Sequence, residues 1–155
     1  MEYLTIDDLK YKANKRVPKA FHDYVNSGSW TETTLKNNSN DFQKISFRQR
    51  VAVDISNRTT KKSLLGVEYK MPVALAPVGS LGMQRADGEI LAAQAAGGFG
   101  VPFTLSTMSI CSIEEVARNT SKPFWFQLYV MRDHDFAKRL VERAKAAQCS
   151  ALVLT

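Results

Sequence analysis

Four residues with hydrogen-bonding side chains close or follow short apolar runs of the sequence: Ser106, Gln127, Tyr129 and Thr155. The amide of Gln127 can both donate and accept hydrogen bonds, as the edge of a pyrimidine-like ring requires, and a hydroxyl can do either. This set indicates an uncharged, hydrogen-bonding cradle for a flat heterocycle. A polar residue can also stand at a strand end simply because it meets water, and Tyr129 can be a core aromatic. The residues alone leave both interpretations open.

The elements that must position these side chains are four short apolar runs, each typical of a strand buried on both faces. They occupy residues 73–76, 101–105, 124–128 and 151–154. One helix is expected in each gap between them. The first covers 88–96 and is closed by Gly97-Gly98, the second follows a capping box at Ser112–Glu115, and the third covers 133–147.

Strands that alternate with helices in this way form either a doubly wound sheet or a TIM barrel, which has eight βα units. The turn after the first run, residues 76–82, lacks the GxGxxG pattern of a dinucleotide-binding unit. We therefore predict an α/β fold, a TIM (β/α)8 barrel of which residues 71–155 supply the first four βα units. Residues 1–70 are predicted to form an N-terminal helical segment and cap.

Within the N-terminal segment, helix starts are expected at Thr5, Pro18 and Thr31. The sequence Asn26-Ser27-Gly28-Ser29 is a stop signal for the second helix, and the third should run toward Phe42. Short strands are expected around Phe47 and over residues 64–69.

Composition excludes several classes of protein. The net charge of +6 is scattered along the chain without an aromatic–basic stripe, so a nucleic-acid partner is not expected. No apolar run approaches a membrane span and no secretion signal is present, which favours a cytoplasmic location. Cys111 and Cys149 lack metal-ligand spacing, so no metal site is predicted. His22 and His134 are expected to be structural or exposed.

Several ordered motifs carry a resemblance to a known family. They occupy residues 71–79, 102–107, 113–117, 125–130, 142–147 and 149–150. Together they resemble the FMN-dependent 2-hydroxy-acid dehydrogenases and oxidases, and most closely the bacterial respiratory members that act on L-lactate. The resemblance implies FMN as cofactor and oxidation of an L-2-hydroxy acid, L-lactate to pyruvate in the members it matches best.

The resemblance also implies roles for individual residues. The backbone around Ala76, Pro77, Val78 and Gly79 would pack against the flavin ring. Hydrogen bonds to that ring would come from Ser106, Gln127 and Thr155. Tyr24 and Tyr129 would reach the substrate carboxylate or hydroxyl, although the sequence pattern alone assigns Tyr24 to packing on its helix.

Two departures from the family pattern affect the expected activity. Gly79 resembles the dehydrogenases, which favour a quinone or cytochrome over oxygen as electron acceptor. The family's catalytic histidine, arginines and lysine would all lie beyond Thr155, so no catalytic residue is assigned here and the chain is expected to be inactive alone. Peripheral membrane association and a homo-oligomer are implied for a full-length member. An oxygen-using oxidase, a flavin-binding remnant without activity and a phosphate-binding TIM-barrel enzyme remain alternatives.

Overall fold

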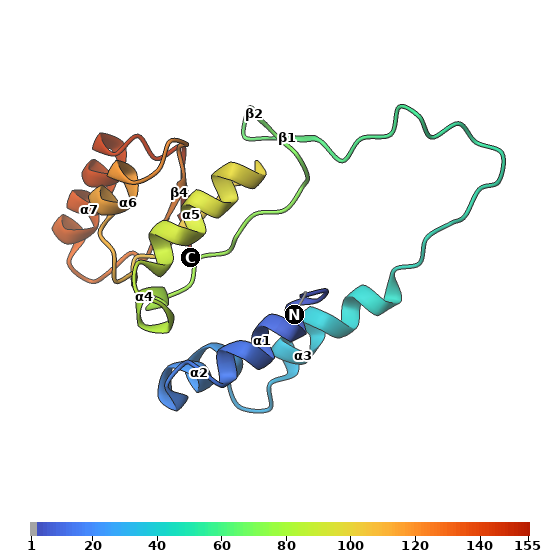
Figure 1. Cartoon of the computed structure of the whole chain (residues 1–155). Coiled ribbons are helices and arrows are strands. Elements are labelled where there is room, and N and C mark those ends of the chain that lie inside the picture. The colour runs from blue at the N-terminus through green and yellow to red at the C-terminus, as the bar shows by residue number, and fades with distance from the viewer. Residues whose placement is uncertain (1–2) are drawn as a thin grey trace. The chain divides into compact units, whose positions relative to one another are not determined.

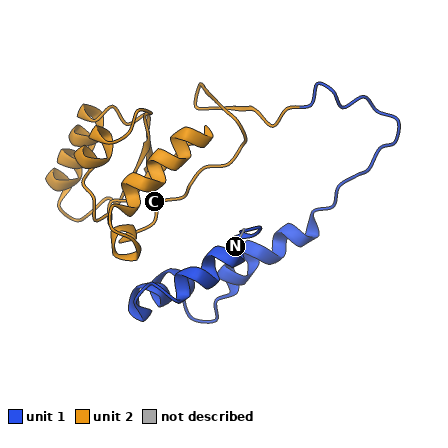
Figure 2. Ribbon diagram, in the orientation of Figure 1, with its two compact units in different colours: residues 1–58 blue, residues 59–155 orange. Residues whose placement is uncertain are grey.

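The computed structural model describes residues 3–155 and divides after Arg58 into two compact units (Figure 2). The first unit holds the N-terminal helices. The second unit, residues 59–155, holds every strand that the structure describes. These include the hairpin at 62–69, which the predicted boundary at residue 70 assigned to the N-terminal helical segment.

The described residues of the first unit, 3–58, are helical up to Lys44 apart from short connections (Figure 1). The helices are α1 (Ile6–Asn14), α2 (Lys19–Asn26), α3 (Thr33–Asn40) and the 3-10 helix η1 (Asp41–Lys44). The start of α1 is a capping box, in which Thr5 Oγ1 accepts from the N–H of Asp8 and the Asp8 carboxylate accepts from the N–H of Thr5. The strand expected around Phe47 was wrong. That segment has no paired strand and the Phe47 side chain is fully exposed, so the local β-propensity has nothing to pair with.

The second unit begins with an antiparallel hairpin of β1 (Lys62–Leu64) and β2 (Val67–Tyr69). The two turn residues, Leu65 and Gly66, both have positive φ angles, 51° and 80°. This is the backbone of the primed turns that match the twist of a hairpin. In place of the one strand expected over residues 64–69, the structure has two short strands joined by a turn at 65–66.

A parallel sheet of three strands follows, in the order β3 (Thr104–Leu105), β4 (Trp125–Leu128) and β5 (Ala151–Leu154). The strand expected at 73–76 is reduced to one parallel bridge, in which Leu75 hydrogen-bonds to the chain on both sides of Phe103. The next hydrogen bonds of this ladder would need the N–H groups of residues 77 and 102, and both residues are prolines. The spatial order still follows the chain order, as consecutive βα units require.

Four helices accompany the sheet: α4 (Leu81–Gln84), α5 (Gly88–Phe99), α6 (Ile113–Arg118) and α7 (His134–Ala146). The capping box at Ser112 and Glu115 is confirmed. The predicted stop at Gly97-Gly98 was wrong, because α5 continues to Phe99 and is capped by Gly100, whose φ of 90° supplies the left-handed conformation that ends a helix. Along the described residues 3–155, no helix is long and apolar enough to cross a membrane.

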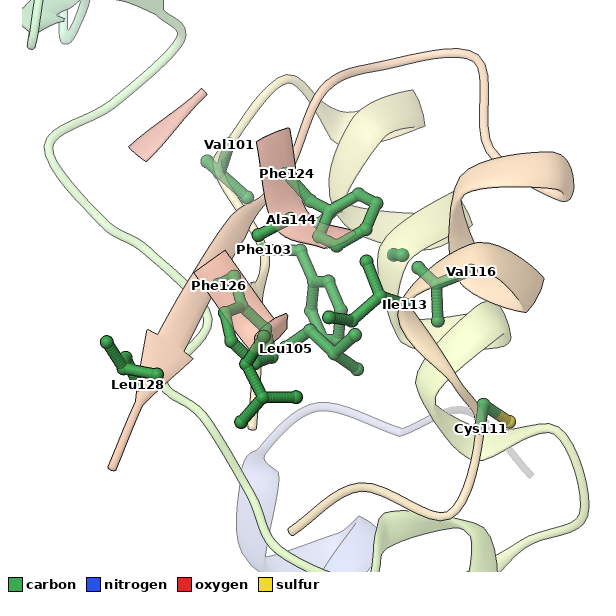
Figure 3. Packing of buried hydrophobic residues seen from close by; sticks show 13 residues of the cluster. Val101, Phe103, Leu105, Cys111, Ile113, Val116, Phe124, Phe126, Leu128 and Ala144 are labelled. Carbon is green, nitrogen blue, oxygen red and sulfur yellow. The ribbon is translucent and has the colours of Figure 1, made fainter. Parts of the chain in front are cut away.

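The core of the second unit lies between the sheet and α5, α6 and α7. Side chains from β3 and β4, among them Leu105 and Phe126, pack against Ile113 and Val116 of α6 and Ala144 of α7 (Figure 3). Neighbouring residues of a strand point to opposite faces. Gln127 therefore faces away from the helices that cover Phe126.

Candidate functional site

The three polar residues at the strand ends form one chain of hydrogen bonds. Ser106 Oγ donates to Gln127 Oε1 over 3.0 Å, and Gln127 Nε2 donates to Thr155 Oγ1 over 2.6 Å. These residues come from three adjacent parallel strands, whose carboxyl ends lie at one edge of the sheet, where ligand sites of βα folds are built. The structure thus brings together the three side chains that the sequence selected, while their contact with a ligand stays a prediction.

The hydrogen bonds of Gln127 leave capacity for a ligand. A glutamine amide has two N–H donors and an oxygen with two lone pairs, and the bonds to Ser106 and Thr155 use one of each. One donor and one lone pair remain on a side chain that is held in a fixed orientation, in a residue only 3% exposed. An adjacent donor and acceptor suit the pyrimidine edge of a flavin, so these residues fit the group that the resemblance implies.

Thr107 fixes the backbone that carries Gln127 and Tyr129. Its Oγ1 donates to the carbonyl of Gln127 over 2.5 Å and accepts from the N–H of Tyr129 over 3.2 Å. The side chain thus joins the end of β3 to the end of β4. Sequence reasoning gave Thr107 no role, although a second hydroxyl directly after Ser106 was a visible signal. Tyr129 itself is 39% exposed, as a residue that reaches a substrate would be.

The segment Ala76–Gly79 follows the bridge at Leu75. Ala76 and Val78 are exposed, whereas Pro77 and Gly79 are half-buried. Directly after this segment, Ser80 adopts a φ of 55° and donates its N–H to the carbonyl of Met108 over 2.8 Å. The loop after the first strand is therefore attached to the loop that follows Ser106, while its packing against a flavin ring stays a prediction.

A buried carboxylate, which sequence reasoning read only as part of a helix start, lies behind these loops. Glu89 is 1% exposed, and its Oε1 accepts from the N–H of Gly82 over 3.0 Å and of Ile110 over 2.9 Å. Burial opposes its charge, but the N–H groups of Ile110 and Gly82 and the Cys111 thiol outweigh burial and lower the pKa of Glu89. Burial, with Glu89 beside it, raises the pKa of Cys111 to about 11. The signal for Glu89 in the sequence was a single charged residue in the largely apolar helix α5.

The remaining candidates lie outside this cluster. Tyr24 belongs to α2 of the first unit, where it is 59% exposed, and its role toward a substrate stays a prediction. His134 is exposed at the start of α7. His22 lies on α2 with Nδ1 3.6 Å from a carboxylate oxygen of Asp23. Among residues 3–155 no three His, Cys, Asp or Glu side chains come together as a metal site would need.

Parallel βα units with an uncharged hydrogen-bonded cluster at the carboxyl ends of the strands define an α/β domain of the barrel or doubly wound kind. The chain belongs to the FMN-dependent dehydrogenase family, whose sequence profile matches residues 13–155. The resemblance drawn from the sequence motifs is therefore confirmed, and FMN is the cofactor on which this family depends.

Curated relatives carry the name L-lactate dehydrogenase. The protein of Haemophilus influenzae (strain PittEE) is 51% identical over 148 residues, and that of Alcaligenes faecalis is 47% identical over 148 residues. Each match covers 96% of this chain but only 39% of the relative. The chain thus spans well under half the length of the curated relatives it matches.

Solved structures with the same fold act on mandelate. A soluble mutant of the membrane-associated (S)-mandelate dehydrogenase from Pseudomonas putida is 35% identical with a TM-score of 0.92, over 99% of this chain and 44% of that one. A mandelate oxidase is 34% identical with a TM-score of 0.91, again over 99% of this chain and 44% of that one. The three-stranded sheet and its helices are consistent with part of the barrel of these enzymes.

Proposed function

We propose that this chain forms the flavin-binding part of an FMN-dependent enzyme that oxidises an L-2-hydroxy acid, L-lactate to pyruvate. The observation that carries the proposal is the hydrogen-bond chain Ser106–Gln127–Thr155 at the carboxyl edge of the sheet. Membership in the FMN-dependent dehydrogenase family and the L-lactate dehydrogenase relatives support it. In this proposal the chain supplies the first four βα units of a (β/α)8 barrel.

The residues of this chain would bind and orient the cofactor. Gln127 would use its remaining N–H and lone pair on the pyrimidine edge of the flavin, and Ser106 and Thr155 would keep its amide from rotating. The backbone of Ala76–Gly79 would pack against the ring. FMN, when bound, accepts the two electrons that leave the hydroxyl-bearing carbon of the substrate.

The substrate would be held by phenol groups. Tyr129, at the end of β4, and Tyr24, on α2, would each donate a hydrogen bond to the carboxylate or hydroxyl of the hydroxy acid. The base that takes the substrate's proton would be a histidine outside residues 1–155, together with arginines that pair with the carboxylate. The 155-residue chain by itself is therefore expected to turn over no L-lactate.

The electron acceptor in this proposal is a quinone or a cytochrome, because Gly79 resembles the dehydrogenase members of the family. The enzyme would work in the cytoplasm, as a homo-oligomer attached peripherally to the inner membrane. One related mandelate dehydrogenase is described as a monotopic membrane protein, which supports that location. The second candidate, an oxygen-using hydroxy-acid oxidase, is favoured by the likeness to mandelate oxidase.

An anaerobic titration tests the substrate and an aerobic one tests the acceptor. L-lactate is added without oxygen to the flavin-loaded protein that contains this chain, and the flavin absorbance is followed. Bleaching by L-lactate, with none by D-lactate, is expected. A flavin that stays oxidised with L-lactate and bleaches with another hydroxy acid would overturn the lactate assignment. Rapid reoxidation by air, faster than by a soluble quinone, would favour the oxidase.

A further inference from the structure

We propose that Glu89 is a positioning residue whose carboxylate clamps the loop after Gly79 to the loop after Ser106. The first loop carries the backbone that would face the flavin ring, and the second carries one end of the Ser106–Gln127–Thr155 chain. Glu89 would thereby set the distance between the two parts of the cradle. The consequence for flavin binding rests on the proposed function, whereas the clamp itself does not.

The clamp is a short, direct connection. One oxygen of Glu89, Oε1, receives the N–H of Gly82 at 3.0 Å and the N–H of Ile110 at 2.9 Å. Between these two contacts and the site, Met108 donates its N–H to Ser106 Oγ over 3.0 Å. Only the backbone from Met108 to Ile110 lies between the hydrogen bond to the carboxylate and the hydrogen bond to the hydroxyl that orients Gln127. A shift at Ile110 is therefore passed on to Ser106.

Close packing shows that the two loops have no room for a larger residue at their contact. A Cβ placed on Gly82 would lie 2.7 Å from Ile110 Cβ, closer than real Cβ atoms come to a neighbour, and 3.1 Å from Glu89 Oε2, a tight contact. The loops meet at this glycine, and the carboxylate lies against the same point. The acid therefore bridges two segments that already pack together through Gly82 and the Ile110 side chain, which makes its hydrogen bonds sensitive to loop position.

An ionised acid suits this place for a physical reason. Glu89 lies in the first turn of α5, where the free N–H groups of the helix favour a negative charge. Hydrogen bonds to a charged acceptor are roughly twice as strong as those between neutral groups. A neutral glutamine retains one acceptor oxygen for Gly82 and Ile110, so it is expected to preserve the connection in weakened form.

The test compares two substitutions of Glu89 with a control on the next helix. Glu89→Met has a similar length but no acceptor, and Glu89→Gln keeps one. The control, Glu114→Gln, weakens an ion pair with Arg143 that joins α6 to α7 and contacts neither loop. For each protein, amide hydrogen exchange at Gly82 and Ile110 and the Kd for FMN are measured, with thermal unfolding as the record of overall stability.

Glu89→Met is expected to speed exchange at both amides by roughly tenfold or more and to weaken FMN binding by about tenfold, because local opening loses both charged hydrogen bonds. Glu89→Gln should give a clearly smaller change in both readouts. The control should lower the unfolding temperature without changing exchange at the two amides or the affinity for FMN. A purely structural acid would instead affect FMN binding only in proportion to lost stability.

Two outcomes would overturn the inference. In the unmodified protein both amides must already exchange slowly. Fast exchange at Gly82 or Ile110 would therefore show that the clamp does not exist, even if Glu89→Met fails to fold. Unchanged FMN affinity in a folded Glu89→Met protein removes the positioning role. If the unmodified protein binds no FMN, the proposed function fails, and the exchange rates still decide whether the clamp exists.

Discussion

Replacing Thr107 with valine removes two hydrogen bonds between the ends of β3 and β4 while the side chain keeps its shape. The hydroxyl donates to the Gln127 carbonyl at 2.5 Å and accepts from the Tyr129 N–H at 3.2 Å. A hydrogen bond contributes about 0.5–1.5 kcal/mol to stability, so Thr107→Val should cost about 1–3 kcal/mol. For a chain of this size that corresponds to a fall in Tm of roughly 2–4 °C for each kcal/mol.

Urea unfolding and amide exchange measure this loss. Thr107→Ser, which keeps the hydroxyl, should retain most of the stability and the slow exchange of the Tyr129 amide. Thr120→Val is a matched control, because Thr120 donates one hydroxyl hydrogen bond to the Val116 carbonyl at the end of α6, away from the strand ends. Thr120→Val should lower the free energy of unfolding by about the contribution of one hydrogen bond and leave the exchange of the Tyr129 amide unchanged. Equal exchange of the Tyr129 amide in Thr107→Val and in the control would refute the reasoning.

Three further outcomes are expected. Gln127→Leu should weaken FMN binding at least tenfold, whereas Gln94→Leu, which removes an exposed amide bonded to a backbone carbonyl, should leave it unchanged; equal Kd values would contradict the cradle. Hydrogen bonds from Arg143 lower the pKa of Glu114 to about 2 from 4.5. The pair's contribution, at most about 1 kcal/mol for so exposed a pair, is therefore complete above pH 4.5 and is lost as the pH falls toward 2. The free energies of urea unfolding of the unmodified protein and of Arg143→Leu should therefore converge at low pH. A difference between the two proteins that stays constant across that range would contradict the contribution of the ion pair. Burial raises the pKa of Cys111 and of Cys149 to about 11, so iodoacetamide at pH 8 should label both slowly until urea is added; fast labelling of the folded protein would show that they are accessible thiolates.

Local features of the fold could be predicted because the residues that determine them are neighbours in sequence. The helix start expected at Thr5 and the capping box expected at Ser112 each depend on side chains and N–H groups three residues apart, and both are present. The strand at 73–76 and the helix stop at Gly97-Gly98 depended on more distant partners. Pro102 on the opposing segment has no N–H with which the pairing of Leu75 could be extended, and α5 is capped at Gly100, whose carbonyl accepts from the N–H of Lys70.

The residues of the candidate site also divide into those that could be predicted from the sequence and those that could not. Ser106, Gln127 and Thr155 could be selected because parallel strands place their carboxyl ends together whatever the details of packing. Glu89 and Thr107 were missed because their partners are backbone N–H and carbonyl groups on other segments, at Ile110, Gln127 and Tyr129, and a sequence does not display the position of its own backbone.

The hydrogen-bond chain from Ser106 to Thr155 also has an order in time. A ribosome releases the polypeptide from its N-terminus, so β3 and β4 can pair before β5 has been synthesised. During that interval Gln127 can bond to Ser106 but not to Thr155, and its amide is held on one side only. The arrival of residue 155 completes the chain of hydrogen bonds, so the Gln127 amide is held on both sides only after three successive strands have been synthesised.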